Sequence, residues 1–151
     1  MLVSASRTDA DALESQLGAV GLRAKKNPPL NIVGQHAFLH FAYTPPEMFY
    51  DVQVDLMLAE CELQNVALER SVDRTVPGME TPIKVVSCED LMLFKLMSGR
   101  MIDLADIAML LRENRPELNI DHLSKWVTQL GATSEFRTAW ADAIVDEPCP
   151  V

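Results

Sequence analysis

Residues 87–111 read SCEDLMLFKLMSGRMIDLADIAMLL and predict two consecutive helices with one break between them. Ser87 can accept a hydrogen bond from the free amides of the first helix, and Asp90 places an acid in its first turn. Gly99 is a typical helix stop, because glycine adopts the left-handed conformation without strain. Asp103 then repeats the acidic start signal for the second helix. This stretch therefore predicts a pair of helices joined by a short turn.

The charged side chains of this stretch allow two interpretations. Lys95 and Arg100 are donors suited to phosphate, and Arg can bind a phosphate through two parallel hydrogen bonds. They can equally pair with Asp103 and Asp106, which are also suited to the N-cap and third position of a helix. The stretch alone favours the structural interpretation and leaves the binding site as the alternative.

Composition excludes several classes of protein. The chain has 151 residues, which suits one domain, and its net charge of -9 opposes non-specific nucleic-acid binding. No apolar run approaches the 18 residues that a membrane span needs, and the N-terminus has no signal-peptide core. Its three cysteines, Cys61, Cys88 and Cys149, are typical of reduced thiols. We therefore expect a cytoplasmic protein that does not bind membranes.

Outward from the helix pair, the pattern predicts strands first and helices later. Residues 32–43 predict a strand in which Ala37, Leu39 and Phe41 alternate with His36, Phe38 and His40. Alternation is clearest in 50–58. Further elements are helices over about 6–20, 62–70, 119–130 and 134–145, and short extended pieces over 22–25, 71–79 and 83–86.

This order predicts an α+β (mixed α/β) fold in one domain over 1–151. Residues 1–86 form the sheet-rich part, with a small mixed sheet and flanking helices. Residues 87–145 form a helical half, and 146–151 are a polar tail.

Acids on the clearest strand are the other candidate site. Asp51, Gln53 and Asp55 point the same way, because side chains alternate along a strand. Carboxylates on one face of a sheet can hold a divalent metal, although a solvated polar face is the more common explanation. His36 and His40 share a face as well, and for them packing or hydrogen bonding is a better explanation than metal binding.

Taken together, these motifs resemble the nucleotidyltransferase-fold proteins of the abortive-infection toxin type, which are small members of the polymerase-beta-like superfamily. The resemblance covers about 51–111 and lies in VQVDLML with Asp55, ALER with Arg70, TPIKVVS, and EDLMLFKLMSGRMIDLADIAMLL. It extends more loosely to 1–130.

The resemblance implies transfer of a nucleoside monophosphate from a nucleotide triphosphate with Mg²⁺. In such enzymes an Asp-x-Asp strand and a third acid on a neighbouring strand hold two magnesium ions. Asp55 matches this third acid, so the resemblance makes it a metal ligand and catalytic residue. Lys95 matches a catalytic, phosphate-contacting lysine, and the nucleotide-binding set is completed by Arg100, Asp103 and Asp106. The role of these two acids is either structural or catalytic.

One departure from the family concerns the metal ligands. The Gly-Ser helix start and the Asp-x-Asp strand are not among these 151 residues, although residues 1–3 resemble the end of that strand. Three explanations stay open: a longer natural protein, a relative with a regulatory role, or a site assembled from Asp51, Asp55 and other acids. We expect Mg²⁺ and nucleotide to bind this chain weakly and catalysis to be weak or absent. Expected partners are a nucleotide, a second copy that covers a sheet edge, and a cognate protein of a toxin-antitoxin type system.

Overall fold

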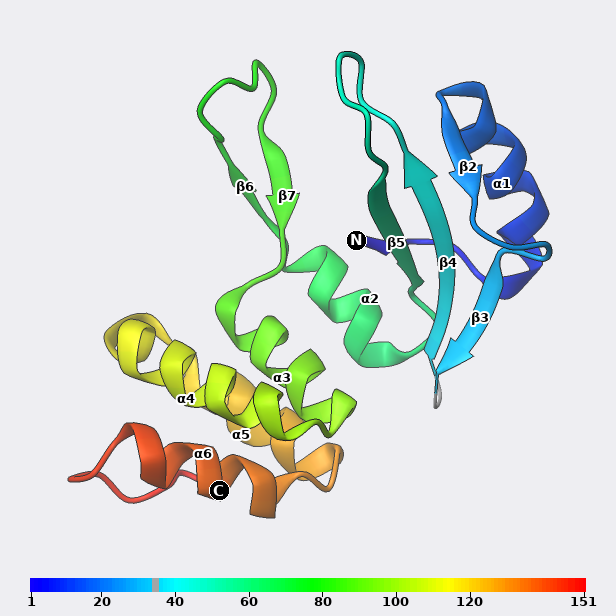
Figure 1. The fold of residues 1–151 in the computed structure, drawn as a ribbon. Coiled ribbons are helices and arrows are strands. Elements are labelled where there is room, and N and C mark those ends of the chain that lie inside the picture. The colour runs from blue at the N-terminus through cyan, green and yellow to red at the C-terminus, as the bar shows by residue number, and fades with distance from the viewer. Residues whose placement is uncertain (34–35) are drawn as a thin grey trace. The chain divides into compact units, whose positions relative to one another are not determined.

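The longest strand, β4 (His36–Tyr43), is the centre of a five-stranded sheet in this computed structural model (Figure 1). The structure describes residues 1–33 and 36–151. Three strands pair with β4 in antiparallel fashion: β2 (Leu22–Ala24), β3 (Leu30–Val33) and β5 (Val52–Leu58). The short β1 (Leu2–Val3) pairs with β5 in parallel. The sheet is therefore mixed, and the predicted mixed α/β fold class is confirmed.

Two compact units divide the chain, Met1–Glu69 and Arg70–Val151. Besides the sheet, the first unit contains η1 (Arg7–Asp9), α1 (Ala10–Ala19) and α2 (Glu62–Glu69). The second unit contains β6 (Val72–Arg74), β7 (Ile83–Val85), α3 (Cys88–Ser98), α4 (Met101–Asn114), η2 (Arg115–Glu117), α5 (Ile120–Gln129) and α6 (Thr133–Ala143).

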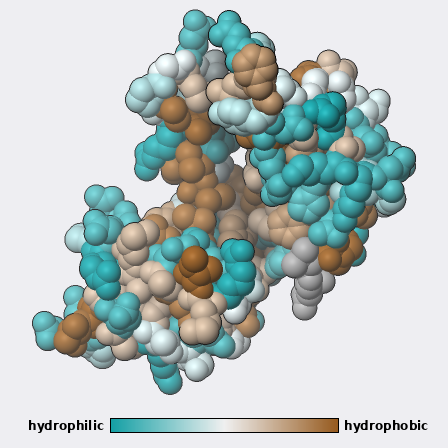
Figure 2. Space-filling view, in the orientation of Figure 1, coloured by the Kyte–Doolittle hydropathy of each residue, from teal (hydrophilic) through white to brown (hydrophobic). Residues whose placement is uncertain are grey.

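Alternation along β4 sorts its side chains onto two faces of the sheet. Ala37, Leu39 and Phe41 are fully buried and form the core of the first unit with Leu56 and Leu58 of β5. Leu13 and Leu17 of α1 pack against this core, so α1 covers this face. The outward side of α1 is largely hydrophilic (Figure 2).

The strand predicted over 32–43 is two strands in the structure. β3 and β4 pair antiparallel, with Leu30 opposite Leu39 and Ile32 opposite Ala37. Gly34 and Gln35, which the prediction included, lie outside the described residues. An apolar run of this length is compatible with one strand or with a tight hairpin, so periodicity alone could not separate the two.

The second unit contains the predicted run of four helices. Ser87 caps α3 by accepting a hydrogen bond from the amide of Asp90, and Gly99 ends it in the left-handed conformation with φ of 67°. Asp103 is the third residue of α4, because the helix begins at Met101 with Arg100 in the N-cap position. The N-cap interpretation of Asp103 is therefore wrong, and so is the third-position interpretation of Asp106, which is the sixth residue of α4. Buried apolar residues of all four helices form the core of this unit: Met92, Leu93, Leu96, Ile107, Leu111, Leu123, Trp126, Val127, Phe136 and Trp140.

β6 and β7 form a separate two-stranded ribbon, which precedes the four helices of the second unit. Val72, Ile83 and Val85 are more than one third exposed, and they form an apolar strip on the ribbon (Figure 2). The tail after α6 is held by contacts. The indole of Trp140 donates to the carbonyl of Glu147, and Arg137 donates to the carbonyl of Val151.

Cys61, Cys88 and Cys149 are free thiols. Among the described residues, no helix combines the length and apolar character that crossing a membrane requires.

Candidate functional site

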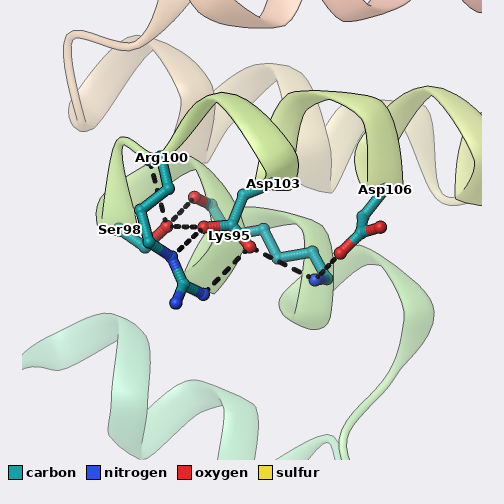
Figure 3. A network of polar contacts seen from close by, with 5 residues as sticks. All are labelled: Lys95, Ser98, Arg100, Asp103 and Asp106. Carbon is teal, nitrogen blue, oxygen red and sulfur yellow. Dashed lines mark hydrogen bonds and ion pairs between the residues drawn. The ribbon is translucent and has the colours of Figure 1, made fainter.

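Four charged residues of the 87–111 stretch meet in one network at the turn between α3 and α4 (Figure 3). The Nζ atom of Lys95 lies 2.5 Å from Oδ2 of Asp106 and 3.4 Å from Oδ1 of Asp103. Arg100 donates to both oxygens of Asp103, at 2.7 Å and 3.1 Å, and the Ser98 hydroxyl also donates to Asp103. The structure therefore brings together all four residues that the sequence assigned to nucleotide binding.

Asp103 is the centre of this network. Its side chain is buried, whereas the Arg100 side chain is 71% exposed. Hydrogen bonds from Arg100 and Ser98 hold the pKa of Asp103 well below its usual range. The hydrogen bond to Asp106 raises the pKa of Lys95 above its ordinary value. The formal charges of Lys95, Arg100, Asp103 and Asp106 sum to zero.

A cluster with no net charge is a poor anion site. A phosphate that reached Lys95 or Arg100 would have to compete with the carboxylates that these groups already contact. The same contacts hold the end of α3 against the first two turns of α4. The geometry of this network therefore favours the structural interpretation of these residues.

Asp55 lies in the first unit, on the face of the sheet opposite the α1 core. His40 is directly across the β4–β5 ladder, and its Nδ1 lies 2.6 Å from Oδ1 of Asp55. The Gln53 amide donates to both carboxylate oxygens of Asp55, at 2.9 Å and 2.8 Å. The contacts of Asp51 are with other residues: it pairs with Arg23 at 2.6 Å and accepts from Thr44.

The hydrogen-bond network determines which nitrogen of His40 carries the proton. Lys26 donates to Oδ1 of Asn31, so the amide nitrogen of Asn31 faces Nε2 of His40, at 3.3 Å. Nε2 therefore accepts, and Nδ1 donates its proton to Asp55. Burial raises the pKa of Asp55, but the hydrogen bonds from His40 and Gln53 outweigh this effect and lower it overall. Asp55 is thus an ionised carboxylate with 41% of its side chain exposed.

The surroundings of Asp55 supply only part of the ligand set that Mg²⁺ needs. Mg²⁺ is usually held by one or two carboxylates together with substrate phosphates and water. Asp55 supplies one such oxygen donor, and the neighbouring groups are the His40 imidazole and the Gln53 amide. In residues 1–33 and 36–151, no three His, Cys, Asp or Glu side chains gather as a metal site.

A further polar cluster, which the sequence interpretation did not assign, surrounds Asp90 in the second unit. The Asp90 carboxylate is fully buried and accepts from Ser87 at 2.7 Å and from Arg70 at 3.1 Å. His122 of α5 contacts its other oxygen at 2.7 Å. Nearby, the amide of Asn119 donates to Glu89 at 2.7 Å. These contacts tie the start of α5, and Arg70 ahead of β6, to the start of α3.

The sequence pattern did not show that His40 contacts Asp55, or that the Asn31 amide lies beside His40. His40 and Asp55 each occupy a predictable face of a predicted strand. Only the register of β4 against β5 shows that they are opposite each other. No protein-family model matches the chain, and it has no match among curated proteins.

Proposed function

We propose that this chain is a nucleotidyltransferase-like protein in which Asp55 is the metal-facing acid, and that it binds Mg²⁺ and a nucleotide triphosphate weakly. The observation that carries the proposal is the parallel pairing of β1 with β5. Leu2 is opposite Met57, and the amino group of Met1 donates to the carbonyl of Asp55 at 2.6 Å. In the family that the sequence resembles, the Asp-x-Asp strand is a neighbour of the strand with the third acid. Asp55 is next to the start of a parallel neighbouring strand, which supports its comparison with the third acid of that family.

Weak binding follows from the charges at each cluster. Asp55 supplies a single carboxylate, and the charges of Lys95 and Arg100 are neutralised by Asp103 and Asp106. We expect dissociation constants for Mg²⁺ with any nucleotide triphosphate to be weaker than about 100 μM, or about 5.5 kcal/mol of binding free energy. In this proposal the Lys95 network joins two helices, and the protein works in the cytoplasm.

A paramagnetic titration tests the metal site at such low affinity. Mn²⁺ in place of Mg²⁺ should broaden the backbone amide signals of β5 around Asp55, and a nucleotide triphosphate should strengthen this effect. Asp55→Asn should remove the broadening. Asp51→Asn is the matched control, because Asp51 is an exposed acid of the same unit that pairs with Arg23. Broadening centred elsewhere, or unchanged in Asp55→Asn, would exclude Asp55 as the metal ligand.

Calorimetry tests the strength of binding. Titration with Mg²⁺ and each of the four common nucleotide triphosphates should give no transition tighter than about 100 μM. A tighter transition that Asp55→Asn removes would show a complete site and overturn the weak-binding part of the proposal.

A second candidate function is a non-catalytic interaction or regulatory module, such as the partner of a cognate protein in a toxin-antitoxin type system. The connection between β4 and β5 favours it. Met48, Phe49 and Tyr50 are consecutive and exposed there, and Phe49 is completely exposed. Exposed aromatic and methionine side chains are enriched in protein interfaces. If this surface joins two copies, sedimentation should show a dimer that Phe49→Ser converts to monomer. A monomer in the unsubstituted protein would exclude self-association.

A further inference from the structure

The sheet face that carries Asp55 also carries a row of aromatic rings. His36, Phe38 and His40 follow one another along the central strand on the same face. The rings of Phe38 and His40 are almost parallel, with an interplanar angle of 8° and centroids 6.2 Å apart. Both side chains are partly exposed, whereas the alternate residues Leu39 and Phe41 are fully buried. Their π-faces are the kind of surface on which a nucleobase stacks.

Amide side chains lie on both sides of the ring row. Asn31 of β3 contacts His40 on one side, and Gln53 of β5 contacts Asp55 on the other. An amide carries donors and an acceptor together, so it can recognise the edge of a base. The row is bounded at its other end, because Gln64 of α2 contacts His36 at 3.0 Å.

Two lysines beside this face are placed to meet a phosphate. Lys25 donates to Oε1 of Gln53 at 2.6 Å, and Lys26 donates to Oδ1 of Asn31 at 3.1 Å. Both side chains are exposed, and their acceptors are neutral amide oxygens. In the described part of the chain, neither lysine forms an ion pair with a carboxylate, in contrast to Lys95. Lys25 also acts on Asp55 and lowers its pKa, so the charge of Lys26, and that of Lys25 in part, is available to an anion.

We propose that the sheet face around Phe38 and His40 binds a nucleotide, with its base stacked on these two rings and its phosphate near Lys25 and Lys26. The inference rests on the proposed function and deepens it, because it gives the nucleotide a binding site on the sheet, whereas the Lys95 network joins two helices. Planar neutral bases suit the rings and amides, and the phosphate suits the two lysines. In this arrangement Asp55 is close to the nucleotide, because His40 and Gln53 both contact the Asp55 carboxylate.

Metal-free titrations with adenosine 5′-monophosphate, followed by NMR, test the inference on the whole chain. The imidazole protons of His40 and the ring protons of Phe38 should shift, because a stacked base adds its ring current. His122 of the second unit is the internal control and should not shift. Adenosine should shift the same rings more weakly than the monophosphate, and ribose 5-phosphate should shift them least.

Matched variants separate the two halves of the site. Phe38→Leu keeps an apolar side chain but removes the ring, and it should weaken the monophosphate at least about fivefold. Tyr43→Leu removes a partly exposed ring on the opposite face of the same strand and should leave the affinity for the monophosphate unchanged. Lys25→Gln should weaken the monophosphate about two- to fivefold while leaving adenosine unchanged. Lys125→Gln is its control in the second unit. Unchanged amide spectra away from each substitution would show that the variants fold.

The outcomes distinguish this inference from the proposed function. Absence of any shift at His40 and Phe38, or shifts confined to the Lys95 network, would overturn the inference and leave the metal test at Asp55 unaffected. Ring shifts without any Mn²⁺ broadening at Asp55 would support nucleotide binding on the sheet and remove the nucleotidyltransferase assignment. Equal loss of affinity in Phe38→Leu and Tyr43→Leu would also contradict stacking on this face.

Discussion

The Nζ atom of Lys95 lies 2.5 Å from Oδ2 of Asp106, 11 residues further along the chain and on the next helix. The same ammonium group also reaches Asp103, so one lysine of α3 contacts two acids of α4. An ammonium group held between two carboxylates is a bridge between helices, and the stability of the second unit should depend on it.

Replacing Asp103 should destabilise the second unit. Asp103→Asn keeps the shape but removes the buried charge that accepts from Arg100, Ser98 and Lys95. Hydrogen bonds to charged groups contribute about 1.5–3 kcal/mol, so we expect a loss of about 2 kcal/mol in the free energy of unfolding. Urea unfolding followed by tryptophan fluorescence reports on this unit, because Trp126 and Trp140 both belong to it. Arg100→Gln is the control. Its exposed side chain should contribute much less than Asp103 does, and equal losses in the two variants would contradict the central role of Asp103.

Acid should weaken the same network. The pKa of Asp103 in the folded protein lies below its ordinary value of 3.8, so the unfolded chain binds a proton first. The stabilisation is therefore fully present well above pH 3.8 and is lost progressively as the pH falls below that value. Between about pH 5 and pH 3, the free energy of unfolding should fall more steeply in the unsubstituted protein than in Asp103→Asn. Parallel pH profiles would show that Asp103 does not titrate as this geometry requires.

His40 should control the acidity of Asp55. The hydrogen bond from Nδ1 of His40 lowers the pKa of Asp55, whereas burial raises it. His40→Phe removes the donor and keeps a ring, so the pKa of Asp55 should rise towards or above its ordinary value of 3.8. Carboxyl-carbon NMR titration measures this pKa directly. His122→Gln, a histidine substitution in the other unit, should leave Asp55 unchanged, and an unshifted Asp55 in His40→Phe would exclude this coupling.

Two glycine substitutions should have opposite signs. Gly99 ends α3 with φ of 67°, so Gly99→Ala places a side chain in the left-handed region and should cost about 1 kcal/mol. Gly18 lies within α1, and a Cβ there meets no atom within 4 Å. Gly18→Ala should therefore stabilise the first unit by about 0.5–1 kcal/mol through helix propensity. Thermal unfolding followed by circular dichroism would reveal both effects, and a neutral Gly99→Ala would contradict the turn geometry.

The Asp90 cluster should be the most sensitive polar site of the second unit. Asp90→Ala removes the shared acceptor of Ser87, Arg70 and His122 from a fully buried position. Breaking a buried ion pair costs about 3–5 kcal/mol, and the partial exposure of Arg70 places this variant near the lower end. Asp121→Ala removes an exposed acid and should change the free energy of unfolding by less than about 0.5 kcal/mol. Similar urea midpoints for both variants would refute this expectation.

Local signals in the sequence predicted most elements of the fold. Ser87 and Gly99 delimit α3 as expected, because a capping oxygen and a left-handed glycine act within a few residues of the helix. Residues 32–43 were less informative. β3 and β4 are both apolar, and the two-residue alternation of side chains is the same in both, so it does not mark where one strand ends and the next begins. The contacts of Glu147 and Val151 in the tail depend on α6 and had no local signal.

The candidate sites differ in the same way: contacts between residues near in the sequence were predictable, and contacts set by the tertiary structure were not. The Lys95, Arg100, Asp103 and Asp106 network joins residues on adjacent helices, so helix spacing was enough to predict it. The contact between His40 and Asp55 depends on the register of β4 against β5, which a sequence pattern does not specify. The His122 contact to Asp90 joins α5 to α3, and a single histidine in a helical pattern gives no hint of its partner.

The alternation of β4 makes one strand serve two surfaces at once. Ala37, Leu39 and Phe41 fill the core, and His36, Phe38 and His40 line the opposite face. Inserting or deleting a single residue in this strand would exchange the two rows, placing imidazoles in the core and leucine on the polar face. Both faces of the sheet therefore constrain the length of β4. We expect substitutions in this strand to be tolerated far better than insertions or deletions.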